Sequence, residues 1–131
     1  MTLAYRNFTT CIQSNNLDLI EHTLTQILEQ EGCSRLVRLP KSFSEDELNR
    51  HYYEVSQDVW IIGLFIGSFG WTIITTFPIE LMCRRAKTSN YPRLSELTRK
   101  IGCNGFHFGA YEYNGILMEA NATGEIFISG E

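Results

Sequence analysis

The sequence predicts an α+β protein, in which an antiparallel sheet of about five or six strands carries helices packed mainly on one face. Segments with the spacing of amphipathic helices alternate with short segments rich in β-branched and aromatic residues. The chain has 131 residues, which is the length of one globular domain, assigned to residues 1–131. Its composition, with 44% hydrophobic and 20% charged residues, is typical of a globular protein and argues against disorder.

Two helices are predicted from apolar spacing together with residues that start or end helices. Residues 15–31 place leucines and isoleucines on one helical face, begin with two asparagines and are followed by Gly32. Residues 93–101 repeat this spacing, carry basic residues near their carbonyl end and are closed by Gly102.

Shorter signals predict two more helices and one strand. Residues 34–40 alternate imperfectly between polar and apolar and are expected to form a short strand. Residues 44–53 begin with a capping box, so we expect a short helix there. Pro78 suits the first turn of a helix, which is expected to continue to about Lys87.

Residues 59–78 are the longest stretch without a formal charge, and their length would suffice for a membrane-spanning helix. Gly67, Ser68 and Gly70 interrupt the stretch in its middle, where they indicate a turn. The flanks are rich in β-branched and aromatic residues, which prefer strands. We therefore predict a β-hairpin and no membrane span.

Folding this hairpin about residues 67–70 predicts which side chains share a face, because neighbouring residues on a strand point to opposite sides. The core face is expected to contain Trp60, Ile62, Leu64, Ile66, Trp71, Ile73, Thr75 and Phe77. The other, mixed face is expected to contain Ile61, Gly63, Phe65, Thr72, Ile74 and Thr76.

Three short strands are expected in the C-terminal part, at residues 106–113, 116–121 and 125–129. Asn114-Gly115 is the strongest hairpin signal in the chain and predicts a type I′ turn. Residues 122–124 are expected to form the next turn, with glycine available for a left-handed position.

A Gly-Cys pair follows both predicted helices, at residues 32–33 and 102–103, and a predicted strand comes after each pair. Two α-β-β-β units would explain this pattern. The alternative is chance, because glycine ends many helices.

The four cysteines, Cys11, Cys33, Cys83 and Cys103, contain no Cys-x-x-Cys pair, and the first residues show no secretory signal. We therefore expect reduced thiols and a cytoplasmic protein that does not associate with membranes. The formal net charge of −4 argues against general nucleic-acid binding.

Cys103 and His107, with Glu112 or Glu119, are the most reactive-looking set, because a catalytic thiol needs a base and a group that orients the base. Cys103 follows a helix end, however, where the helix dipole raises a thiol pKa. A structural cysteine is therefore the better interpretation. The three histidines are isolated in sequence, so neither a metal site nor a cofactor is expected.

Basic residues concentrate in one region, with only Glu96 among them as an acidic neighbour: Arg84, Arg85, Lys87, Arg93, Arg99 and Lys100. This region either meets an acidic protein partner or forms two solvated helix faces. The tyrosines near residues 52–53 and 111–113 either line a pocket or border a sheet. The candidate residues for binding a ligand or partner are Arg84, Arg85, Lys87, Tyr91, Arg93, His107 and Tyr111.

Two classes of function remain. A non-catalytic interaction or regulatory protein is favoured, because no residue constellation supports chemistry. The alternative is a small-molecule binding protein or enzyme with a pocket lined by tyrosines and His107.

A homodimer is expected because helices on one side of a sheet leave the other side uncovered. The expected interface contains Ile61, Phe65 and Ile74. The alternative is that residues 3–12 or the 44–53 helix cover this face within one chain.

Overall fold

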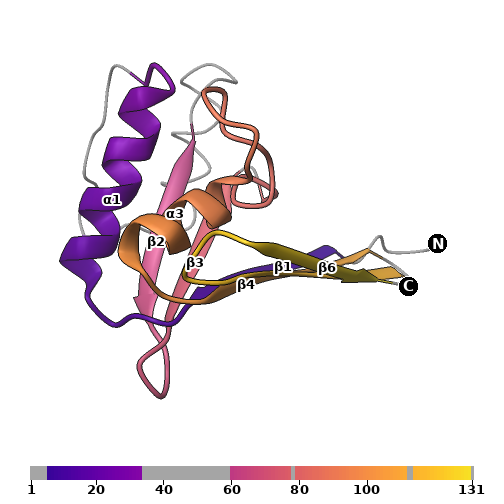
Figure 1. Cartoon of the computed structure of the whole chain (residues 1–131). Helices are drawn as coiled ribbons and strands as arrows, with labels where there is room; N and C mark the ends of the chain where they lie inside the picture. The colour runs from indigo at the N-terminus through magenta and orange to yellow at the C-terminus, as the bar shows by residue number, and fades with distance from the viewer. Residues whose placement is uncertain (1–5, 34–59, 78, 112–113, 131) are drawn as a thin grey trace.

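The computed structural model describes residues 6–33, 60–77, 79–111 and 114–130 (Figure 1). It contains one antiparallel sheet of six strands in the order β2-β3-β1-β4-β5-β6. The strands are β1 (Arg6–Ile12), β2 (Ile61–Ile66), β3 (Thr72–Phe77), β4 (Gly105–Tyr111), β5 (Asn114–Ala120) and β6 (Ile126–Gly130). The helices are α1 (Leu17–Gln30) and α3 (Arg93–Ile101). The predicted α+β class is confirmed.

The helices predicted at residues 15–31 and 93–101 form at the expected places. The side chain of Asn16 accepts a hydrogen bond from the backbone N–H of Leu19 at 3.1 Å, which caps the start of α1. Gly102 ends α3 in the left-handed conformation, with φ of 81°, as a glycine at this position allows.

The two helices pack on the same face of the sheet (Figure 1). Ile12, Ile74 and Ala120 point to this face from three different strands, and they belong to the buried core. Their core neighbours on the helices are Ile20, Leu24, Ile27, Leu94 and Leu97. Neither helix in the described residues is long and apolar enough to cross a membrane.

Strand β1 lies in the middle of the sheet, which the sequence did not predict. It pairs with β3 on one side and with β4 on the other, so it joins the hairpin to the three C-terminal strands. Residues 6–12 are therefore part of the sheet and cannot cover one of its faces.

The predicted hairpin is confirmed, but its predicted register is wrong. Ile66 pairs with Thr72, so the connecting loop is 67–71, and the loop closes through a 2.8 Å bond from the N–H of Gly67 to the carbonyl of Trp71. Phe69 and Gly70 both have positive φ in this loop. Compared with the even-numbered loop assumed in the prediction, this odd-numbered loop places each side chain of the second strand on the opposite face of the sheet.

Because of this register, Thr72, Ile74 and Thr76 face the helices, together with Ile62, Leu64 and Ile66. Ile74 is 1% exposed, and Thr72 is fully buried, where its hydroxyl donates to the carbonyl of Ser14 at 2.6 Å. The predicted assignment of Ile73 and Thr75 to the core face is correspondingly wrong.

The helix expected from Pro78 to Lys87 is absent from the described residues 79–87: residues 79–83 form turns, and Arg85 forms an isolated antiparallel bridge with Pro92. The carbonyls of Met82 and Arg84 accept hydrogen bonds from the N–H groups of Leu94 and Arg93, at 2.9 and 3.0 Å. These carbonyls hold the start of α3, so they are not available for helical bonds to residues four positions later.

The C-terminal strands form as predicted, but the first turn between them does not. Asn114 pairs with Tyr111, and Gly115 pairs with Ala110, so both lie in β5 and not in a turn; residues 112–113 lie outside the described residues. The turn at 122–124 is confirmed, with Gly124 at φ of 89°.

The strand expected at 34–40 and the helix expected at 44–53 also lie outside the described residues. The division into two α-β-β-β units therefore stays a prediction.

Candidate functional site: an uncovered sheet face and a polar groove

The sheet face opposite the helices, here called the aromatic face, is rich in apolar side chains. Directly paired residues lie on the same face, so the strand register assigns its members. They include Cys11, Phe65, Ile73, Phe106, Phe108, Leu117, Glu119 and Phe127. The rings of Trp71 and Phe106 are 5.5 Å apart, which extends the aromatic cluster to the hairpin loop.

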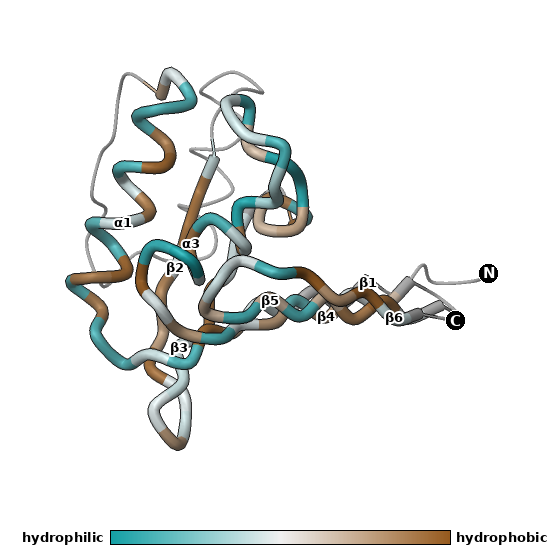
Figure 2. Tube along the Cα trace, in the orientation of Figure 1, coloured by the Kyte–Doolittle hydropathy of each residue, from teal (hydrophilic) through white to brown (hydrophobic). Residues whose placement is uncertain are grey.

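Large side chains of the aromatic face are open to solvent. Phe65 and Phe127 are each 56% exposed, and Phe108 is 41% exposed. No helix covers this face in the described part of the chain, because α1 and α3 both pack on the other side (Figure 1). Figure 2 shows hydrophobic residues continuing along the strands to the end of the sheet near the two termini, beyond both helices.

The aromatic face carries little charge. Among the strand residues that the register places on it, Glu119 is the only one with a formal charge. The expected interface residues divide between the two faces: Ile61 and Phe65 belong to the aromatic face, whereas Ile74 is in the core. The prediction that these three residues form one surface is therefore wrong for Ile74.

Arg93, one of the candidate binding residues, is buried in a salt bridge. Its Nη2 and Nε contact the two carboxylate oxygens of Glu31 at 2.6 and 2.9 Å, and its Nη1 donates to the carbonyl of Leu81 at 3.1 Å. The ring of Trp60 lies 4.6 Å from the guanidinium carbon. These contacts tie the end of α1 to the start of α3, so Arg93 stabilises the fold.

The ammonium of Lys87 lies 5.7 Å from the centre of the same Trp60 ring, and the backbone N–H of Lys87 donates to Glu31 at 2.9 Å. Lys87 therefore borders this buried cluster.

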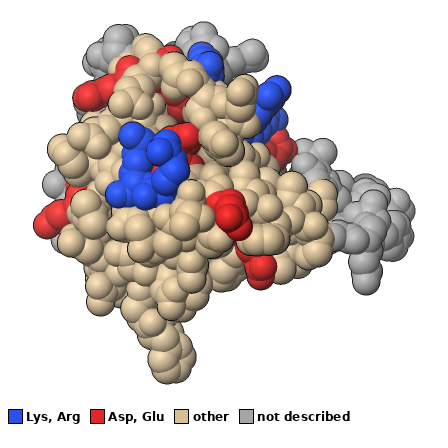
Figure 3. All heavy atoms as spheres, viewed as in Figure 1, with Lys and Arg blue, Asp and Glu red and all other residues tan. Residues whose placement is uncertain are grey.

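Other basic residues also have acidic partners. Arg84 forms an ion pair with Glu80, and Arg99 forms one with Glu96 at 2.6 Å. Glu31 and Glu80, which lie outside residues 84–100 in the sequence, therefore oppose basic residues of this region as Glu96 does. Figure 3 shows basic atoms in a compact patch with acidic atoms close beside it.

His107 is buried on the helix-bearing side of β4, where its Nδ1 lies 2.7 Å from the hydroxyl of Thr10. Burial lowers the pKa of His107, and the charge of Glu80 opposes this shift in part. The strand pair Tyr111 and Arg6 lies at the other end of β4, and the side chain of Tyr111 lies outside the described residues. The structure therefore does not show a pocket lined by His107 and Tyr111.

Cys103 is half-buried and packs against the core. Burial raises its thiol pKa, which disfavours the thiolate needed for nucleophilic attack. Burial also raises the pKa of Cys11, Cys33 and Cys83, and all four cysteines are free. No group of three metal-ligating side chains occurs among the described residues.

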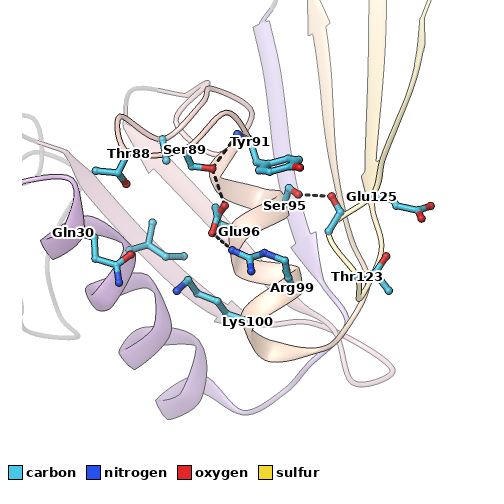
Figure 4. A pocket seen from close by; sticks show the side chains of 13 residues that line it. Gln30, Thr88, Ser89, Tyr91, Ser95, Glu96, Arg99, Lys100, Thr123 and Glu125 are labelled. Carbon is cyan, nitrogen blue, oxygen red and sulfur yellow. Dashed lines mark hydrogen bonds and ion pairs between the residues drawn. The ribbon is translucent and has the colours of Figure 1, made fainter.

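A polar groove of about 570 Å³ lies on the helix-bearing side of the molecule (Figure 4). Four segments form it: the second half of α1, the loop 86–91, α3 and the turn 123–125. Tyr91, a predicted candidate, lines the groove, together with Arg99 and Lys100. No sequence motif connects these four segments, so the groove could not be predicted.

The carboxylate of Glu96 has a fixed position in this groove. It accepts hydrogen bonds from the hydroxyl of Ser89 at 2.8 Å and from Nη2 of Arg99 at 2.6 Å. Burial alone would raise the pKa of Glu96, but these bonds and the charges of Arg99 and Lys100 outweigh burial and lower it. The groove therefore contains an ionised carboxylate at neutral pH.

No protein-family model, no curated protein sequence and no solved structure matches this chain.

Proposed function

We propose that the protein is a non-catalytic interaction module that works as a homodimer, paired through the aromatic face. The observation that carries this proposal is the exposure of Phe65, Phe108 and Phe127 on one continuous, almost uncharged sheet face. Exposed apolar patches of this kind mark interaction sites more often than free surface.

A second copy is a suitable partner for this face because isologous pairing places identical surfaces against each other. A surface with many charges would then bring like charges together, whereas the described strand residues of this face include one charged residue, Glu119. Two sheets packed about 10 Å apart, as in a β-sandwich, would bury the phenylalanines of both copies.

Glu119 also indicates where the two-fold axis lies. It belongs to β5, which is next to the edge strand β6. Burying two carboxylates without partners is costly, so Glu119 belongs at the solvated rim. This places the centre of the interface over β1 and the neighbouring part of β4, near Cys11 and Phe108, with Phe106, which pairs directly with Glu119, toward the rim.

Light scattering coupled to size exclusion tests the proposal. The chain of 15.1 kDa should elute with twice this mass at micromolar concentration. Phe108→Asp should produce a folded monomer, because it brings a charge into the apolar centre of the interface. Phe69→Asp is the matched control, since Phe69 is 98% exposed at the tip of the hairpin loop and lies off the aromatic face.

Two results would contradict the proposal. A monomer at high micromolar concentration would show that the chain does not pair with itself. A dimer that persists in Phe108→Asp would place the interface elsewhere.

An acidic protein partner and a cytoplasmic location stay predictions from the sequence. The ion pairs of Arg84, Arg93 and Arg99 with glutamates argue against an acidic partner, because they already neutralise three of the basic residues.

A further inference from the structure

We infer that the polar groove binds a small organic carboxylate. The groove is on the side of the sheet that carries the helices, opposite the aromatic face, so the dimer proposed above would leave it open (Figure 4). The inference rests on the charges and hydrogen-bond donors of the groove and does not depend on dimerisation.

Arg99 supplies donors in a fixed orientation. Its Nη2 donates to Glu96, and a guanidinium has five N–H donors, so others remain for a ligand. Its aliphatic stem packs against the turn at Gly124, where an added Cβ would come within 3.2 Å of Arg99 Cδ and 3.3 Å of Arg99 Cβ. This packing and the ion pair hold the guanidinium in place before a ligand arrives.

Lys100 supplies a positive charge that the ion pair does not neutralise. It follows Arg99 on α3, is exposed, and forms no salt bridge within the described residues. Figure 4 shows Arg99 and Lys100 extending from α3 toward the middle of the groove. A carboxylate placed between them would receive charge-assisted hydrogen bonds, which are stronger than neutral ones.

The acidic side chain in the groove favours one negative charge over two. The carboxylate of Glu96 is ionised and lies beside Arg99. It would repel a phosphate dianion more strongly than a carboxylate with a single charge. Organic carboxylates therefore fit the groove better than phosphate.

The remaining walls suit a planar or apolar ligand body. The ring of Tyr91 is 55% exposed beside the groove, while Ile27 and Ala86 are buried parts of its lining. The tyrosine ring can stack on a planar ligand while its hydroxyl stays in contact with water.

Titration with sodium benzoate, followed by amide chemical shifts in ¹H–¹⁵N spectra, tests the inference. Benzoate should shift the amides of residues 86–91, 95–100 and 123–125 in a saturable way, with a Kd on the order of 1 mM. Benzamide, which has nearly the same shape without the charge, should bind at least about fivefold more weakly. Inorganic phosphate should also bind more weakly than benzoate.

A pair of variants, each of which removes one positive charge, separates an effect of the groove from an effect of net charge. Lys100→Ala should weaken benzoate binding by about threefold to tenfold, whereas Arg85→Ala, which removes the same charge outside the groove, should leave the Kd unchanged. Tyr91→Ala should weaken binding too, because it removes the stacking surface.

The inference is overturned by any of three results. The amides of the groove show no saturable shift, benzamide or phosphate binds as tightly as benzoate, or Arg85→Ala weakens binding as much as Lys100→Ala does. A monomeric protein that still binds benzoate would contradict the proposed dimer and leave the groove inference intact.

Discussion

The two faces of the sheet have similar apolar side chains and very different surroundings. On the helix-bearing face, Ile12 and Ile74 are almost completely buried in the core, and apolar residues stay exposed only outside that core, as Ile66 and Ile128 do. On the aromatic face, Phe65 and Phe127 are more than half exposed. A sheet with one solvated face normally alternates apolar and polar residues along each strand. Strands β2 and β6 lack this alternation and carry apolar residues on both faces, a pattern typical of a sheet with both faces covered.

This difference shows that the apolar pattern of the strands indicates how many faces of the sheet must be covered by other structure. The described helices supply one covering layer, and the sequences of β2 and β6 are suited to two. The following predictions test how far the two faces differ.

The largest effect is expected from Glu31→Gln, because it removes the charge that compensates Arg93 in the buried cluster on the helix side. Loss of one partner of a buried ion pair should lower the free energy of unfolding by about 3–5 kcal/mol. Urea unfolding measures this change. Glu29→Gln is the control, since Glu29 is exposed two residues earlier, on α1. Equal losses in both variants would show that the ion pair is not responsible.

Neighbouring isoleucines compare the two faces directly. Ile74→Ala should lower the free energy of unfolding by about 2–5 kcal/mol, since Ile74 is 1% exposed in the core. Ile73→Ala, on the aromatic face, should have a clearly smaller effect when both are measured in the monomeric Phe108→Asp background. Similar losses by chemical denaturation would contradict the register of the hairpin.

A pH dependence is expected from His107 on the buried face. Its pKa is lowered by burial, so the unfolded chain binds a proton at a higher pH than the folded chain does. Stability should therefore decrease as the pH falls below about 6.5, the pKa of an unperturbed histidine.

Urea unfolding at several pH values between neutrality and pH 5 would measure this loss. His107→Gln should reduce it, whereas His22→Gln should not, because His22 is exposed on α1. A loss of stability that is unchanged in His107→Gln would assign the pH dependence to other groups.

The smallest effect concerns the charge on the aromatic face. Glu119→Gln should tighten dimerisation by about twofold to fivefold, as expected for removing a partly solvated charge near an interface rim. Sedimentation equilibrium gives the dissociation constant, with Glu125→Gln as a control outside this face. A much larger gain would mean that Glu119 lies at the centre of the interface, and weaker dimerisation would mean that its carboxylate has a partner across it.

Local sequence signals predicted the elements that depend on local contacts. Helices α1 and α3 follow from apolar spacing and from the residues that cap them, and the existence of the β2–β3 hairpin follows from its central glycines. The hairpin register depends on loop length, and two positive φ angles at Phe69 and Gly70 determine it. No pattern in the flanking strands reveals that choice.

Contacts between distant residues were not predictable from one sequence. β1 is recognised as a strand only by pairing with β3 and β4, and its own seven residues show a weak pattern. Similarly, Arg93 was a candidate for binding because it lies in the basic region of the sequence. Nothing in the sequence reveals that its partner is Glu31, so its structural role in the ion pair could not be predicted. Of the candidate residues, Tyr91 is the one that lines the groove.

The central position of β1 has a consequence for the order of folding. Both of its neighbours come much later in the chain, so β1 cannot form ladder hydrogen bonds on either side until β3 and β4 have been synthesised. Closing such long loops carries an entropic cost before any contact rewards it, which slows folding. Until β1 pairs with both neighbours, the hairpin and the C-terminal strands are separate small sheets, each with an unpaired edge at which it can associate with other chains. Docking of β1 is therefore the step that both completes the sheet and ends this period of vulnerability during synthesis.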